Sequence, residues 1–100
     1  MTDRKIIEEL VDVELAEANK EYPLFHSAHE AYGVLKEECE ELWDDYLAID
    51  GHMDEMWDLI RQDDAIAYKT NKIYGLAINA ACEAIQIAAM CKKVKQSDLR

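Results

Sequence analysis

Residues that interrupt helices are scarce in this sequence. It has three glycines and one proline in 100 residues, too few for the many turns of a β-sandwich or β-barrel. It also lacks a glycine-rich phosphate-binding loop, a G-x-S-x-G motif and the Glu-x-x-His pair of di-iron bundles. Good helix formers such as Ala, Glu, Leu, Lys and Met are plentiful. The sequence therefore predicts one all-α domain over residues 1–100.

Basic charge is also scarce. The net charge of −11 argues against binding to a nucleic-acid polymer and against binding to an anionic membrane surface. The acidic side chains are unevenly distributed: residues 1–64 carry 20 acidic and 5 basic residues, whereas residues 65–100 carry 2 and 6. The two parts are expected to attract each other, and bound cations can offset the crowding of like charge on the first part.

The compartment can be predicted from cysteines and hydrophobic runs. The three cysteines are an odd number and form no C-x-x-C pair, which is typical of reduced thiols in a cytoplasmic protein. The N-terminus has no signal-peptide hydrophobic region. The longest apolar stretch, residues 75–90, is interrupted by Asn79, Glu83 and Gln86, so no membrane span is expected.

Apolar residues at helical spacing predict an N-terminal helix within residues 1–22. It should end before Pro23, because the residue before a proline avoids the helical conformation. A long helix is expected over residues 24–50. Its start is either near Pro23 or at a capping box made by Ser27 and Glu30.

Asp50-Gly51 is the predicted stop of that helix, followed by a short helix or packed excursion over 52–62. Asp63-Asp64 predicts the start of a second long helix over 64–93. Residues 94–100 are expected to be a tail that frays near its end.

The helix predicted over 64–93 is apolar nearly all round, which indicates burial on more than one side. A chain of 100 residues has too little else to cover it. We therefore expect a helical bundle with two long antiparallel helices, completed by assembly into a homo-dimer or homo-tetramer.

Acidic residues cluster on the first long helix. Glu38, Glu41 and Asp45 fall within about a 60° arc at helical spacing, beside the apolar seam. Carboxylates gathered in this way repel one another unless a cation lies between them, and oxygen ligands suit Mg²⁺ or Mn²⁺. The alternative is a solvated acidic face.

Polar residues also interrupt the second long helix, and they project within about 60° of one another: Lys72, Asn79, Glu83 and Gln86. A polar stripe on a buried helix is costly unless its groups are satisfied, and Glu83 needs a counter-charge or a metal. The alternative is a structural hydrogen-bond network, with Lys72 or another cation as partner. If the two stripes face each other, they form a shared metal site.

Three short motifs carry a family resemblance: HEAY at 29–32, EECEELW at 37–43 and EAIQIAAM at 83–90. Together, over about residues 23–93, they resemble the MazG-like all-α nucleoside triphosphate pyrophosphohydrolases, and within these the small phage and prophage type. The resemblance implies Mg²⁺-dependent cleavage of an NTP or dNTP between its α and β phosphates, which gives a nucleoside monophosphate and pyrophosphate. It also implies a dimer or tetramer.

The family's metal ligands lie in E-x-x-E and E-x-x-D motifs on the two long helices. The resemblance assigns Glu38 and Glu41 to the first motif and Glu83 to the start of the second. Gln86 replaces the family's final Asp; its carbonyl oxygen can ligate a metal, but it brings no charge.

Other roles follow from the same hypothesis. Glu37 or Asp45 is a candidate general base for the attacking water. Four residues are candidate substrate contacts: His29, Lys69, Lys72 and Asn79. Two alternatives remain open. One is a non-catalytic nucleotide-binding or protein-interaction bundle with a degenerate metal site, and the other is an enzyme for a different nucleotide, such as dUTP or a modified dNTP.

Overall fold

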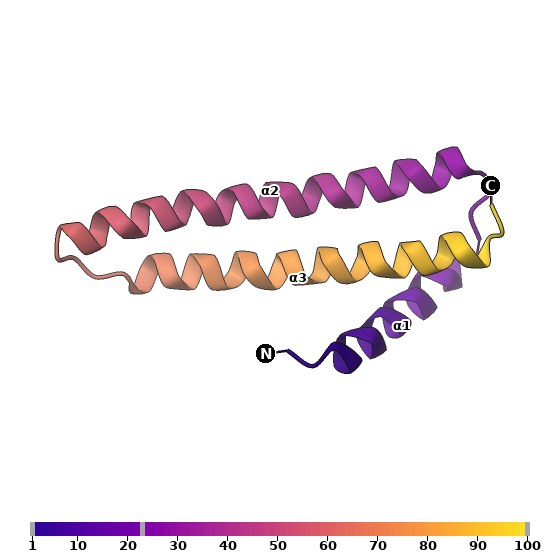
Figure 1. Cartoon of the computed structure of the whole chain (residues 1–100), viewed down its shortest axis with the longest axis horizontal. Coiled ribbons are helices and arrows are strands. Elements are labelled where there is room, and N and C mark those ends of the chain that lie inside the picture. Colours follow the sequence, from indigo (N-terminus) through magenta and orange to yellow (C-terminus); the bar gives the residue numbers. More distant parts are fainter. Residues whose placement is uncertain (1, 23, 100) are drawn as a thin grey trace.

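The computed structural model describes residues 2–22 and 24–99. These residues form three helices and no strand, which confirms the all-α class. The helices are α1 (Arg4–Glu21), α2 (Ala28–Arg61) and α3 (Ala67–Gln96). The chain turns after α2, and α3 returns alongside it (Figure 1). α1 packs against α3, and the molecule is elongated, with extents of 56 × 27 × 21 Å.

The start of α2 follows the predicted capping box. Ser27 is the N-cap, and its hydroxyl accepts a hydrogen bond from the backbone N–H of Glu30 at 3.1 Å. The Glu30 carboxylate in turn accepts from the backbone N–H of His26 at 3.3 Å. The N-cap prediction is confirmed, and α2 begins at Ala28 rather than at residue 24.

The predicted stop at Asp50-Gly51 is wrong, because α2 continues through it to Arg61. Glycine ends a helix when it adopts a left-handed conformation, but no described glycine has a positive φ. The apolar spacing that continues after Gly51 keeps the chain helical and absorbs the modest cost of a glycine inside a helix. The separate element expected over 52–62 is thus the last part of α2.

The helix stop lies at Asp63, which has φ 56°. The N–H of Asp63 donates to the carbonyl of Ile60 at 3.0 Å, and the N–H of Asp64 donates to the carbonyl of Leu59 at 2.9 Å. These two bonds form a Schellman motif, which satisfies carbonyls at the end of a helix. The prediction that Asp63-Asp64 starts the next helix is therefore wrong, and α3 begins at Ala67.

The end of α3 is packed rather than frayed as far as the structure describes it. α3 continues to Gln96, and the Ser97 hydroxyl accepts from the backbone N–H of Phe25 at 2.9 Å. Leu99 packs against the hydrophobic core. The tail predicted over 94–100 is thus helical or anchored up to Leu99, and Arg100 lies outside the described residues.

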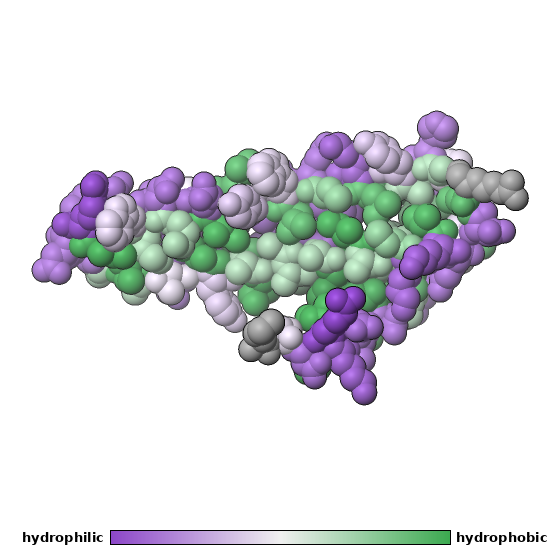
Figure 2. Space-filling model, in the orientation of Figure 1, coloured by the Kyte–Doolittle hydropathy of each residue, from purple (hydrophilic) through white to green (hydrophobic). Residues whose placement is uncertain are grey.

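The core lies at one end of the molecule, where all three helices meet. Its buried residues come from α1, the segment before α2, and both long helices: Val11, Leu15, Phe25, Ala31, Ala89 and Met90. At the other end, large apolar side chains such as Trp57 and Tyr74 are more than half exposed. A band of hydrophobic residues follows α3 across the face in Figure 2.

α3 is long and apolar enough to cross a membrane. The core helix of a water-soluble protein passes the same test of length and composition. In the single chain, the buried residues of the described part of α3 are Ala89, Met90 and Lys93.

Candidate metal centre

Three carboxylates converge between the two long helices. Glu38 and Glu41 are three residues apart on α2 and therefore lie on one face. Glu83 comes from the α3 turn that packs opposite. One oxygen from each carboxylate lies within 4.8 Å of the others. The two polar stripes of the sequence thus meet.

Gln86 reaches the same group from the next turn of α3. With its amide nitrogen turned toward α2, it donates to Glu38 Oε2 at 2.7 Å and to Glu83 Oε2 at 3.2 Å. This orientation offsets part of the repulsion between the two carboxylates. With the amide turned round, its carbonyl oxygen would stand against two carboxylate oxygens, an arrangement that needs a cation between them.

The electrostatics of the cluster reflect the crowding of like charge. Hydrogen bonding and repulsion from Glu83 raise the pKa of Glu41 above its usual range. Hydrogen bonding to Glu38, followed by partial burial, raises the pKa of Glu83. A divalent cation opposes both shifts, because it favours the ionised carboxylates.

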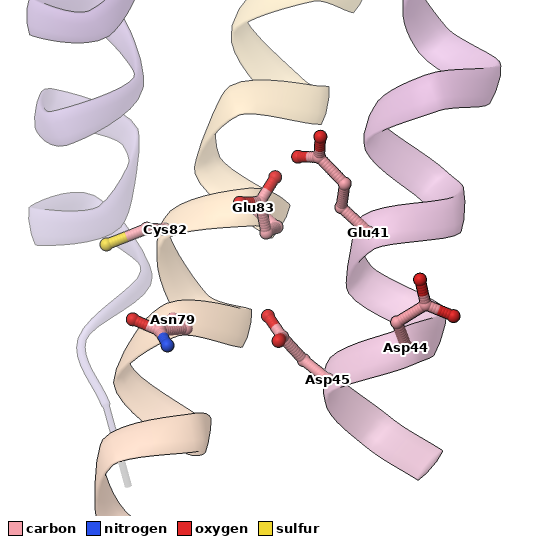
Figure 3. Close-up of a pocket in the computed structure, with 6 residues that line it drawn as sticks. All are labelled: Glu41, Asp44, Asp45, Asn79, Cys82 and Glu83. Carbon is pink, nitrogen blue, oxygen red and sulfur yellow. The ribbon is translucent and has the colours of Figure 1, made fainter. Parts of the chain in front are cut away.

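A cavity of about 340 Å³ opens beside the carboxylates and is lined by Glu41, Asp44, Asp45, Asn79, Cys82 and Glu83. Glu41 and Asp45 point from α2 toward α3, and Glu83 points toward α2 (Figure 3). Asp44 and Cys82 point away from the gap in the same view. Asp45 therefore lies at the cluster, on the side away from Gln86. Asn79 also lines the cavity, but its amide lies on the side of α3 away from α2 in this view.

Other predicted residues lie elsewhere. Glu37 is exposed and does not line the cavity, although its charge contributes to the raised pKa of Glu41. His29 is exposed near the start of α2, nine residues before Glu38, which is about 13 Å along the helix.

The two predicted lysines also lie away from the cluster. Lys72 is about 16 Å along α3 from Glu83, and its ammonium lies over the ring of Tyr68, 5.4 Å from the centroid. Lys69 is farther still. It donates to the Glu55 carboxylate and lies 3.2 Å from His52 Nδ1. Within one chain, neither lysine faces the carboxylates.

The donor set fits a hard divalent cation. Mg²⁺ takes oxygen ligands in a compact octahedral shell and is commonly held by a few carboxylates, with water or phosphate oxygens filling the shell. Glu38, Glu41 and Glu83 supply such carboxylates, and Gln86 can add a carbonyl. Within the described parts of the chain, no His or Cys side chain joins this group, which disfavours zinc.

Two cavity residues were not predicted from the sequence, namely Asp44 and Cys82. Each directly neighbours a residue at the cluster, Asp45 or Glu83. Adjacency along the chain is the one signal that points to them, and side chains at neighbouring helix positions diverge.

Comparison of the chain with protein-family models, curated proteins and solved structures gives no match.

Proposed function

We propose that this chain is a Mg²⁺-dependent nucleoside triphosphate pyrophosphohydrolase that resembles the MazG-like enzymes. It would cleave an NTP or dNTP between the α and β phosphates and release a nucleoside monophosphate and pyrophosphate. The observation that carries the proposal is the convergence of Glu38, Glu41 and Glu83 within 4.8 Å. These residues match the carboxylates of the resemblance and come from two helices far apart in sequence.

In this proposal Glu38, Glu41 and Glu83 hold the metal, and Gln86 completes the shell or supports it. Mn²⁺ would fit the same oxygen ligands. When bound, the metal would neutralise charge on the phosphates of the substrate.

The side chains beside the cluster have separate tasks. Asp45 points into the gap, so it is better positioned than the exposed Glu37 to orient the attacking water and accept its proton. Asn79 lines the same cavity and would contact the ribose or a phosphate.

Lys69, Lys72 and His29 lie too far from the cluster to serve the same substrate from within one chain. In the proposed assembly they would contact substrate only across a subunit interface. Of the two lysines, Lys72 is the better candidate, because its side chain forms no ion pair among the described residues, whereas Lys69 is paired with Glu55.

The proposed assembly is a bundle in which the antiparallel pair α2–α3 packs against another copy, as a dimer or tetramer. The large exposed apolar side chains toward the far end of this pair support it, because exposed apolar patches of this kind mark interaction surfaces. The proposed location is the cytoplasm, with no membrane attachment and no nucleic-acid polymer as partner.

Pyrophosphate release from a panel of NTPs and dNTPs, with and without Mg²⁺, tests the proposal. The wild type should turn over at least one nucleotide, and Glu38→Gln should lose the activity. Glu40→Gln is the matched control, since Glu40 is exposed and forms its ion pair with Lys36 away from the cluster. If the folded wild-type protein shows neither turnover nor stabilisation by Mg²⁺, the proposed enzymatic activity is refuted.

One observation favours a second candidate, a non-catalytic helical bundle that binds a nucleotide or a protein. Gln86 can satisfy Glu38 and Glu83 by hydrogen bonding alone, so the cluster can persist without metal. Nucleotide binding without release of pyrophosphate would identify this case. Recovery of turnover in Gln86→Asp would then show that Gln86 is the cause of the missing catalytic activity.

A further inference from the structure

The carboxylate cluster lies in the weakly packed part of the α2–α3 pair. None of residues 32–88, all of which the structure describes, is buried. The cluster brings Glu38, Glu41 and Glu83 together across the two helices, and like charges at this distance push the helices apart when no cation is bound. Contacts elsewhere along this part of the pair therefore determine how α3 lies on α2.

Lys69 forms an ion pair that joins α3 to α2 in this part of the molecule. Its side chain is only 15% exposed, and its ammonium donates to the carboxylate of Glu55 and to Nδ1 of His52, the latter at 3.2 Å. Because an ammonium can only donate, the Nδ1 of His52 accepts, which requires the neutral ring. Among residues 2–22 and 24–99, no other ion pair connects the two long helices.

The contact of Lys69 lies on the same seam between the helices as the cluster. His52 follows Glu38 by fourteen residues on α2, and Lys69 precedes Glu83 by fourteen residues on α3. Fourteen residues are two heptads, which return to nearly the same face of a helix. All four residues are half-buried. Two polar contacts thus lie on one seam, about 21 Å apart along the helices.

The apolar residues of this seam do not fix the alignment of the helices by themselves. Half-buried apolar residues recur at intervals of seven on both helices: Leu35, Leu42, Ile49 and Met56 on α2, and Ile73, Ala80, Ile87 and Val94 on α3. A shift of α3 by seven residues would again place apolar residues against apolar residues. The same shift would move Lys69 about 10 Å along α2, out of reach of Glu55 and His52.

We propose that Lys69, with Glu55 and His52, selects the one alignment of α2 and α3 that brings the three carboxylates of the cluster together. Lys69 is then a positioning residue for the metal centre. A polar group within an apolar seam can specify the register of two helices, because it is satisfied in one register only. The inference rests on the proposed metal centre only for the affinity measurement, and the alignment itself is measured without metal.

Lys69→Met separates this role from a general effect on stability. Met fits an apolar seam, so the variant should melt at or above the wild-type temperature in circular dichroism. Its helices should nevertheless adopt more than one alignment.

Double electron–electron resonance between two spin labels measures the alignment. One label is placed on Cys91 and the other on Asp54→Cys, both exposed positions, and the exposed Cys39 and Cys82 are replaced by Ser. Without Mg²⁺, the wild-type seam should give one distance. Lys69→Met should add a second distance that differs by about 10 Å.

Calorimetric titration with Mg²⁺ measures the consequence for the metal centre. Binding to Lys69→Met should weaken by roughly fivefold or more, because apparent affinity falls with the fraction of molecules in the competent alignment. Lys36→Met is the matched control, since it removes the same charge and breaks an ion pair that lies within α2. It should match the wild type in both measurements.

Reversal of the ion pair tests the contact itself. Lys69→Glu combined with Glu55→Lys should restore the single distance, because His52 can donate to a carboxylate as well as accept from an ammonium. If Lys69→Met does not fold, Glu55→Gln takes its place, because the Glu55 side chain is 58% exposed, and it should also show the second distance.

Three results would overturn the proposal. The first is a single, wild-type distance in Lys69→Met, or in Glu55→Gln where that variant replaces it, which would show that apolar packing alone aligns the helices. The second is a second distance of the same size in Lys36→Met. The third is failure of the reversed pair to restore the single distance. Wild-type protein that binds no Mg²⁺ refutes the metal centre instead, and the distances still decide the role of Lys69.

Discussion

Gln86 is the position at which the two roles proposed for the cluster make opposite predictions, so replacing it with Asp is informative. The substitution removes the amide whose nitrogen, when turned toward α2, donates to Glu38 at 2.7 Å and to Glu83 at 3.2 Å. It also adds a negative charge beside both carboxylates. Without metal, the variant should be less stable than the wild type. With Mg²⁺, it should gain more stability than the wild type does.

The size of the effect can be worked out from the geometry. Hydrogen bonds to charged groups contribute about 1.5–3 kcal/mol each when buried, and we take about 1 kcal/mol for the pair because all three side chains are partly exposed. Like-charge repulsion adds about 1 kcal/mol at such distances in a watery environment. The total of about 2 kcal/mol corresponds to a drop of roughly 10 °C in melting temperature for a domain of this size.

Thermal unfolding followed by circular dichroism measures the loss of stability in EDTA and the gain of stability in Mg²⁺. A metal at a hundredfold excess over its dissociation constant stabilises the folded state by about 2.7 kcal/mol, so Mg²⁺ at that excess should offset the whole loss in Gln86→Asp. Asn71→Asp is the matched control. It adds the same charge to α3 at an exposed position twelve residues from Glu83, breaks no side-chain hydrogen bond of the described chain, and should change stability by less than about 0.5 kcal/mol.

Two results would refute this reasoning. If Gln86→Asp melts with the wild type in EDTA, Gln86 does not bridge the carboxylates. If Mg²⁺ raises the melting temperature of both proteins equally, position 86 lies outside the metal's coordination shell.

Three further predictions concern stability. Gly51→Ala should stabilise the chain by about 1 kcal/mol in urea unfolding, because an added Cβ at Gly51 meets nothing within 4 Å; destabilisation would indicate that α2 breaks there. Asp63→Gly should stabilise by about 0.5 kcal/mol, because it relieves the left-handed backbone and removes a negative charge from a helix C-terminus, whereas Asp63→Ala should not. In EDTA, the free energy of unfolding should fall as pH rises from 4.5 through the raised pKa of Glu83, because the folded state binds protons more tightly than the unfolded state in that window. Glu83→Gln should flatten this part of the pH profile measured by urea unfolding. An unchanged pH profile in the variant would contradict the prediction.

The sequence predicts the helices better than their ends. Apolar spacing correctly indicated the all-α class, and Ser27 with Glu30 correctly marked the start of α2. The end of α2 was misplaced by more than a full turn, because glycine and aspartate are ambiguous. Gly51 can adopt an ordinary helical backbone, and Asp63 can either start a helix or adopt the left-handed conformation that ends one.

The convergence of the carboxylates can be predicted from helical spacing in the sequence. Glu38 and Glu41 share a face by spacing alone, and Glu83 stood out as a charge in an apolar helix. The positions of Lys69 and Lys72 were not predictable, because they depend on the register between α2 and α3. That register pairs Lys69 with Glu55.

The burial of Lys93 is difficult to predict from the sequence, because this residue lies in a basic run typical of a helix end. Its spacing contained a signal: it follows Ala89 by four residues and Met90 by three, so it lies on the same face as two buried residues. Residues of one basic run can lie on different faces of a helix, so some of them can be buried while their neighbours are exposed to solvent.

The position of the core at one end of the α2–α3 pair has a consequence for how the molecule opens. Local unfolding proceeds most easily where few apolar side chains are buried, which here is the end formed by Trp57 and Tyr74. Glu41 and Glu83 join α2 to α3 between that end and the core. A ligand held between these carboxylates therefore acts as a clamp that stops the separation of the two helices from spreading toward the core. Hydrogen exchange should slow on the core side of the clamp first, and the far end should become protected only when another surface covers it.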